Sequence, residues 1–174
     1  MKAIKKPFIF FMIVLWSAAC GQNTEAIRQP AVPEPIEVEI HPPAELSVEE
    51  AQALVPFRIR EPAVPFPVTR KFARILDTGS RFDAVEITYE NSDEGFVMVL
   101  LTTNSKADTV PQGRKGEKLK NGAQTWEQIT EHVVGVYWRH DGLTYTLVSM
   151  QYADGSMGKL YDYPKLLEIA NSIQ

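Results

Sequence analysis

Histidine and serine side chains are the first candidates for catalysis or metal binding in this 174-residue chain. The histidines are His41, His132 and His140, and none of them is part of an H-x-x-x-H or H-E-x-x-H pattern that would place two imidazoles on one face. Ser149 and Ser156 stand in no G-x-S-x-G elbow, and no glycine-rich stretch is typical of a phosphate-binding loop. We therefore predict that the chain is not an enzyme and has neither a metal site nor a cofactor.

The only cysteine, Cys20, lies directly after an apolar segment near the N-terminus. Three lysines within MKAIKK precede the ten apolar residues Pro7–Trp16, a run too short to span a bilayer, which needs about 20 residues. A positive start, a short apolar run and the small residues Ser17, Ala18 and Ala19 are typical of a secretory signal peptide.

Small residues that end in Cys20 and are followed by Gly21 resemble the lipobox of bacterial lipoproteins. The resemblance implies that the chain is cut after residue 19 and that the Cys20 sulfur is lipidated, although Ser17 stands where that motif usually has Leu. Two or more acyl chains anchor a protein firmly, so the predicted location is the extracytoplasmic face of the cell membrane. The alternative is an ordinary secretory signal with a buried cysteine.

Without residues 1–19, which hold three lysines and no acidic residue, the chain has 15 basic and 22 acidic residues and a net charge of −7. This charge disfavours nucleic acids and anionic lipid surfaces as partners. A single cysteine also excludes an intramolecular disulfide, so the domain must be held by its own core. The length that remains is sufficient for one core.

Residues 20–45 are predicted to be the lipid anchor and a flexible linker, because Asn23–Glu45 holds five of the twelve prolines and five glutamates. An alternative for part of it is an edge strand, since Ile36, Val38 and Ile40 alternate with glutamates. Residues 46–174 form the predicted domain.

Two helices are predicted, one at each end of this domain. Ser47 and Glu50 form a capping-box pattern ahead of the helix Val48–Leu54, which Pro56 stops. Near the C-terminus, Pro164 fits the first turn of a helix whose apolar stripe is Leu166, Ala170 and Ile173.

The segments between the helices alternate with period two or are continuously apolar, as strands do, and Asn121-Gly122 and Asp141-Gly142 predict tight hairpin turns. We predict an α+β fold, with one curved antiparallel sheet of about six to seven strands and both helices packed on it. The predicted strands are Val68–Leu76, Phe82–Glu90, Phe96–Thr103, Glu117–Leu119, Ala123–Ile129, Val133–His140 and Leu143–Met150.

Aromatic residues gather in the last third of the chain. Trp126, Trp138 and Tyr145 are predicted as a candidate ligand face, because Trp126 and Trp138 on alternating strands could share one side of the sheet. The alternative is that these rings fill the core beneath the helices. A basic group around a predicted loop, Arg114, Lys115, Lys118 and Lys120, is interpreted as a solvated face, with binding of an anionic wall polymer as its alternative.

The pieces SVEEAQALVPFRI, NG, VGVYWRHDGLTYTLVS and LLEIANSI occur in an order that resembles the DUF4367 family, found in lipoproteins and in the outside portions of anti-sigma-factor-like and sporulation proteins of Firmicutes. The resemblance covers Leu46–Gln174 and is most specific over Val136–Leu147, where Trp-x-x-Asp-Gly-x-x-Tyr-x-Leu occurs. No function is assigned to that family, so the resemblance implies a fold and a setting and no catalytic residue.

These observations together predict a lipid-anchored extracytoplasmic binding module with a sensory or envelope-maintenance role. Its partners would be the membrane, through the lipid, and an envelope protein or an apolar ligand. The alternative is a carrier or chaperone of the LolA/LolB type for lipids or lipoproteins, and a hydrolase is the least supported class.

Overall fold

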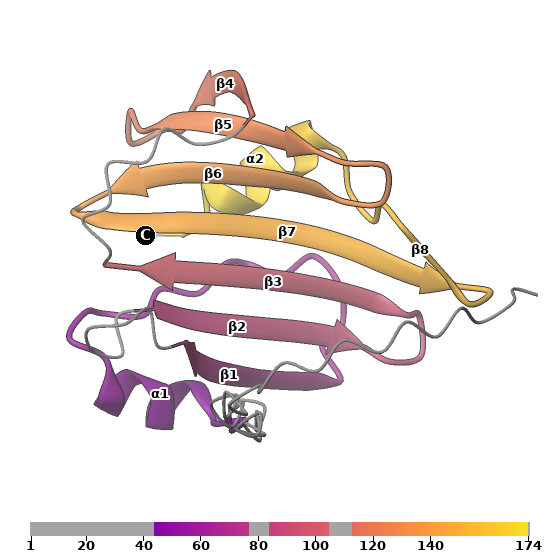
Figure 1. Cartoon of the computed structure of the whole chain (residues 1–174), viewed down its shortest axis with the longest axis horizontal. Coiled ribbons are helices and arrows are strands. Elements are labelled where there is room, and N and C mark those ends of the chain that lie inside the picture. The colour runs from indigo at the N-terminus through magenta and orange to yellow at the C-terminus, as the bar shows by residue number, and fades with distance from the viewer. Residues whose placement is uncertain (1–43, 77–83, 105–112, 174) are drawn as a thin grey trace, which may run out of the picture. The chain divides into compact units, whose positions relative to one another are not determined.

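The computed structural model describes residues 44–76, 84–104 and 113–173, all within the unit that spans residues 40–174 (Figure 1). The fold is α+β, with one antiparallel sheet and two helices, as predicted. The predicted signal peptide, Cys20, the linker to residue 43 and the alternative edge strand at Ile36–Ile40 lie outside the described residues. Within the described part, no helix is long and apolar enough to cross a membrane.

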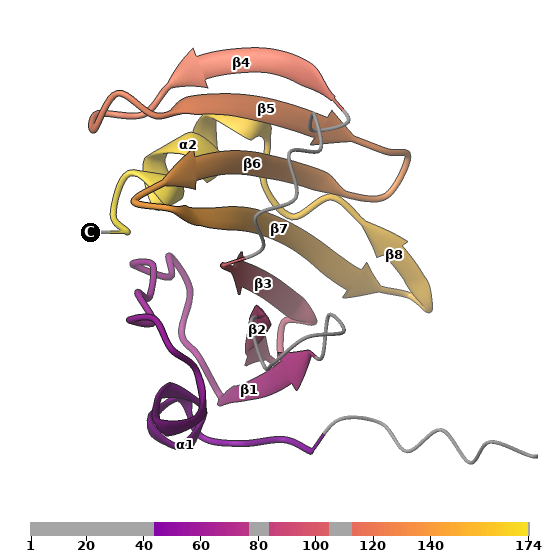
Figure 2. The same cartoon turned by 60° about the vertical axis from the view of Figure 1, so that its left-hand side comes forward.

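Eight antiparallel strands form the sheet in the order β1-β2-β3-β7-β6-β5-β4, and β8 pairs with β7 (Figure 1). The sheet twists and curves along its length, as Figure 2 shows. The strands are β1 (Arg70–Leu76), β2 (Ala84–Asn91), β3 (Phe96–Thr103), β4 (Arg114–Lys118), β5 (Gln124–Ile129), β6 (Val134–His140), β7 (Leu143–Ala153) and β8 (Ser156–Gly158).

Tight turns with positive φ close several of the hairpins, because asparagine, aspartate and glycine tolerate that backbone region. Asp141 and Gly142 have φ of 52° and 75° between β6 and β7, and Gly122 has a φ of 86° between β4 and β5. Both predicted turns are therefore confirmed. The sequence prediction missed β8, and β4 begins at Arg114, three residues earlier than predicted, because this charged edge strand carries no alternating apolar pattern.

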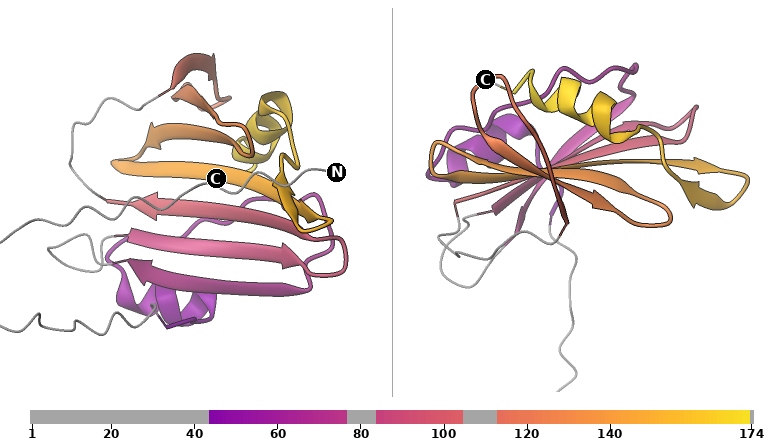
Figure 3. Two further views of the ribbon diagram at one scale, coloured as in Figure 1. Left: turned by 45° about the vertical axis from the view of Figure 1, so that its right-hand side comes forward. Right: turned by 90° about the horizontal axis from the view of Figure 1, so that it is seen from above.

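The helix α1 (Val48–Leu54) has the predicted capping box, in which the Ser47 amide donates to Glu50 Oε2 (2.8 Å) and the Glu50 amide donates to Ser47 Oγ (3.1 Å). The helix α2 (Tyr163–Ala170) begins after Asp162, whose carboxylate accepts from the Lys165 amide (3.0 Å). Both helices contribute to one hydrophobic core and cover the same face of the sheet, as the view from above in Figure 3 shows.

We call the helix-covered side of the sheet the core face. The pairing register aligns its buried side chains across the strands, and they include Ala73, Val85, Ile87, Tyr89, Met98, Leu100, Val136, Trp138, Tyr145 and Leu147. The opposite side, the second face, carries Phe72 between the guanidinium groups of Arg70 and Arg74, at 4.5 and 4.7 Å from the ring centre.

The segment between α1 and β1 has no strand and is held by side chains. The Gln52 amide side chain donates to the Phe57 carbonyl (2.9 Å) and accepts from the Ile59 amide (2.7 Å). Further along, the Ala63 amide donates to Ser172 Oγ (2.7 Å), which joins this segment to the chain after α2. These contacts bring Arg60 close to the C-terminal end of α2.

The buried Tyr89 hydroxyl is expected to lower the free energy of unfolding at alkaline pH. Burial raises the pKa of Tyr89 above its ordinary value, and the neighbouring Glu61 carboxylate, 2.9 Å from the hydroxyl, raises this pKa further. Since the unfolded chain loses the Tyr89 proton near pH 10 and the folded chain keeps it, this contribution to stability is full below that pH and declines above it.

We expect the free energy of unfolding of the wild-type protein to fall faster between about pH 10 and pH 11 than that of Tyr89→Phe, by about 1 kcal/mol over this interval. Urea titrations of both proteins at each pH measure the difference. Equal losses in the two proteins would contradict the expected ionisation behaviour of Tyr89.

Candidate binding site

The predicted ligand face does not exist as one surface. Trp138 pairs with Tyr145 on the core face, where the rings stack at 5.0 Å and are 2% and 1% exposed. Trp126 pairs instead with Tyr137 and lies on the second face, because Thr125 is the residue opposite Trp138. The prediction that Trp126 and Trp138 share a face was wrong by one residue of register, and the alternative, a core role, holds for Trp138 and Tyr145.

The predicted basic loop is also divided. Arg114 and Lys115 lie on β4 instead of a loop, and they face opposite sides of the sheet because Arg114 pairs with Glu127 and Lys115 with Trp126. The Arg114 guanidinium forms an ion pair with the buried Glu127 carboxylate. These side chains therefore do not form a single cationic surface.

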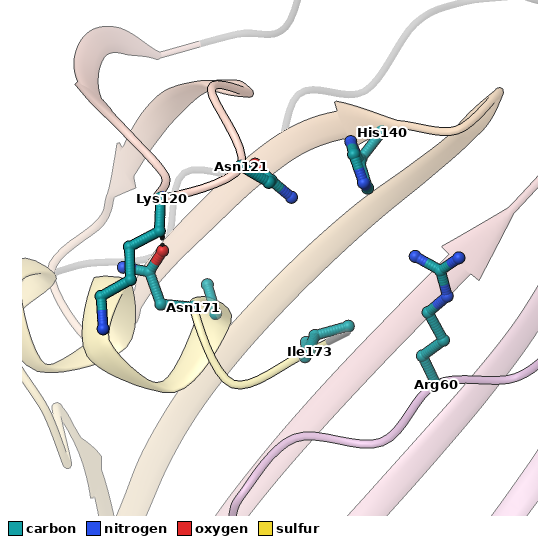
Figure 4. Close-up of a pocket in the computed structure, with 7 residues that line it drawn as sticks. Arg60, Lys120, Asn121, His140, Asn171 and Ile173 are labelled. Carbon is teal, nitrogen blue, oxygen red and sulfur yellow. Dashed lines mark hydrogen bonds between the residues drawn. The ribbon is translucent and has the colours of Figure 1, made fainter.

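A hollow of about 390 Å³ lies at the end of the sheet, and we call it the end hollow (Figure 4). It lies where four parts of the chain meet: the segment before β1, the β4–β5 turn, the end of β6 and the C-terminal end of α2. Its lining residues are Arg60, Lys120, Asn121, His140, Ala170, Asn171 and Ile173.

Hydrogen-bond donors from three of these parts converge on the end hollow. In Figure 4 the Arg60 guanidinium and the His140 imidazole point toward each other across it, whereas the Lys120 ammonium points away along α2. The Asp141 carboxylate, at the rim, links the first two groups: its Oδ2 lies 3.1 Å from Arg60 Nη2 and 3.3 Å from His140 Nε2.

The two asparagines use their carbonyl oxygens for structure and keep their NH2 groups for other partners. Asn121 Oδ1 accepts from the Ala123 amide (3.0 Å), and Asn171 Oδ1 accepts from the Lys120 amide (2.7 Å). Each side-chain nitrogen must then point elsewhere, and Figure 4 shows the Asn121 nitrogen directed toward the space beside His140. Ile173 adds an apolar wall.

Buried hydroxyl groups lie behind this end of the sheet. Tyr145 pairs with Trp138, which lies two positions before His140 on β6. The Tyr145 hydroxyl has no hydrogen-bond partner among the described residues. Burial raises the pKa of Tyr145, while the Arg60 charge lowers this pKa and the Asp141 charge raises it. The phenol is therefore within electrostatic reach of the two groups that meet at the rim of the end hollow.

A second hollow, of about 490 Å³, lies beside the start of α2 and has tyrosine walls. Its Tyr163 hydroxyl is 2.7 Å from Thr125 Oγ1 and accepts from the Glu117 amide (3.0 Å), so this ring ties α2 to β4 and β5. Its Arg114 is already paired with Glu127. We take the end hollow as the better candidate site, because Arg60, His140 and Asn121 from three segments converge on it.

Sequence reasoning missed most of the end hollow. The Asp141-Gly142 pattern predicts the turn, which the structure confirms, but no sequence pattern connects Arg60, Asn171 or Ile173 with it. The one available signal was that the Asn121-Gly122 and Asp141-Gly142 turns close alternate hairpins, which places both turns at the same end of the sheet.

Among the described residues, no group of three or more histidine, cysteine, aspartate or glutamate side chains is arranged to hold a metal ion. Comparison of the chain with protein-family models, curated proteins and solved structures found no match. The resemblance to the DUF4367 family therefore remains a prediction from the sequence.

Proposed function

We propose that this protein is a lipid-anchored extracytoplasmic binding module that holds a ligand in the end hollow without transforming it. Its role would be sensory or would serve maintenance of the cell envelope. The membrane part of the proposal rests on the sequence around Cys20 and on the Pro/Glu-rich residues that separate it from the domain. The lipid holds the protein at the membrane, and the separated domain meets the ligand.

One observation supports the binding role most strongly: donors from separate parts of the chain converge beside an apolar wall. Arg60, His140 and Asn121 come from three segments, and Ile173 lies on a fourth. Small-molecule sites are concave and combine apolar walls with placed polar groups, and the end hollow combines its polar groups with the apolar side chains of Ala170 and Ile173.

The test is binding without turnover. We expect ligand-observed NMR on the full chain, with a panel of carboxylates, phosphates, sugars and neutral amides, to find at least one binder that the protein leaves chemically unchanged. Binding should weaken in Arg60→Ala and in His140→Ala. Matched controls are Arg58→Ala, which changes an exposed arginine two residues away, and His132→Ala, which changes a histidine outside the end hollow.

Two results would contradict the proposal. One is a binder whose affinity falls equally in the control variants, since its site would then lie elsewhere. The other is turnover of a substrate that a single substitution abolishes, which would return the protein to the hydrolase class.

The LolA/LolB-type carrier remains a second proposal. Such a carrier needs space between the helices and the sheet for acyl chains, but Trp138, Leu147 and Leu166 fill the described core there. We rank it second for this reason. Mass spectrometry of lipids that co-purify with the protein would support the carrier if it found a stoichiometric lipid in addition to the anchor.

A further inference from the structure

We infer that the end hollow takes the carboxylate of its ligand between Arg60 and His140, and that the Asp141 carboxylate competes for this position in the free protein. The inference rests on the proposed function, because it names the chemical class that the same site binds. It also assigns Asp141 a role beyond its turn.

The position of the Asp141 carboxylate shows what these two groups accept. Its Oδ2 is within 3.3 Å of both Arg60 Nη2 and His140 Nε2, so one carboxylate oxygen lies between both donors. Guanidinium groups bind carboxylates through short, charge-assisted hydrogen bonds. Asp141 is 54% exposed, so packing does not hold its side chain in place, and a ligand carboxylate can replace it.

The charge of the end hollow fits a carboxylate better than a phosphate. Among the described residues that line the hollow, Arg60 supplies the one permanent positive charge directed into the space, since the Lys120 ammonium points away (Figure 4). A phosphate near neutral pH carries up to two negative charges and favours several cations. A monoanion matched to one guanidinium, with a hydrocarbon part against Ile173, fits both the charged and the apolar part of this lining.

The buried Tyr145 hydroxyl lies in the core behind the end hollow and carries no part of this inference. A buried hydroxyl without a hydrogen bond is destabilising. Tyr145 is 1% exposed and pairs with Trp138 on the core face. Thr102 lies opposite Tyr145 on β3. Neither of these two hydroxyl groups has a hydrogen-bond partner among the described residues. Because neither side chain lines the end hollow, these hydroxyls belong to the core behind the site and do not contact its ligand.

Asp141→Asn separates competition from structure. Asn tolerates positive φ as well as Asp does, and Asn-Gly is the dipeptide most favoured in such turns, so the hairpin is retained while the carboxylate is lost. Asp154→Asn is the matched control, because Asp154 also precedes a glycine in a tight turn, with a φ of 51°, but lies outside the end hollow.

The experiment is an NMR titration of the full chain in detergent micelles with butyrate, with empty micelles as blank and butyramide as the neutral isostere. We expect butyrate to bind and butyramide to bind far more weakly. Asp141→Asn should tighten butyrate binding about threefold to fivefold, because the variant lacks the exposed ion pair that competes with the ligand. Arg60→Gln should weaken butyrate binding by at least about tenfold, because the ligand loses its charged partner. Asp154→Asn should match the wild type, and circular dichroism checks the folding of each variant.

The source of the carboxylate is distinguished by a tripeptide with either a free or an amidated C-terminus. Tighter binding of the free form than of butyrate would identify a peptide C-terminus, and equal or weaker binding would identify a free small acid. Butyrate affinity that Asp141→Asn leaves unchanged or lowers would overturn the competition. If inorganic phosphate or a neutral compound binds at Arg60 and butyrate does not, the assignment of a carboxylate ligand is wrong, although the proposed binding function stands. If no compound binds at Arg60, the carboxylate assignment and the proposed function both fail.

Discussion

Replacement of Trp138 by alanine is expected to lower the free energy of unfolding by about 3–5 kcal/mol, a large part of the stability of a domain of this size. Trp138 is 2% exposed and stacks on Tyr145 on the core face of the sheet, as part of the hydrophobic core. The substitution removes the buried ring and leaves a cavity that its neighbours can fill only in part. Urea unfolding followed by circular dichroism measures the loss.

Trp126→Ala is the matched comparison, since it removes the same side chain from the second face. Trp126 is half-buried and makes an edge-to-face contact with Tyr137 at 5.8 Å. Its loss should cost at most about 2 kcal/mol. A cost for Trp126→Ala equal to or above that for Trp138→Ala would mean that the sheet register or the position of the core is incorrect.

Replacement of Cys20 by serine is expected to abolish incorporation of labelled palmitate, because serine has no thiol to carry the lipid. Without lipid, the lipoprotein-specific peptidase should not cut the chain, so precursor or a miscut soluble product should accumulate. Labelling of cells that produce wild type or Cys20→Ser, followed by membrane fractionation, measures both effects.

Ser17→Leu provides the control for this experiment, because it restores the residue that the lipobox usually has at that position. It should be labelled at least as well as the wild type. Equal labelling of wild type and Cys20→Ser, or labelling of neither, would refute the lipid anchor and leave Cys20 as an unexplained thiol.

Much of the fold could be predicted because its signals are local. The Ser47–Glu50 capping box and the Asp141-Gly142 turn depend on residues within a few positions of each other, and the structure has both. The strands β4 and β8 could not be predicted in the same way. One is a charged edge strand and the other has three residues, so each is defined by backbone pairing with a neighbour and not by its own side-chain pattern.

The site was harder to predict than the fold, because it depends on register and on contacts between distant segments. Side chains alternate between faces, so a pairing shift of one residue was enough to separate Trp126 from Trp138. Arg60 lies beside the Asp141 turn, and Gln52 and Ser172 hold the irregular segment before β1 that carries it. No local pattern around Arg60 encodes that arrangement.

Mapping of ligand contacts by NMR is the measurement that tests the central claim most directly, namely that this protein binds its ligand in the end hollow. During titration of the full chain with butyrate, we predict that the His140 ring and the side-chain amides of Asn121 and Asn171 shift, and that the Trp126 indole does not. Shifts at the Trp126 indole without shifts at those three residues, or no shift at any of these groups, would contradict the account.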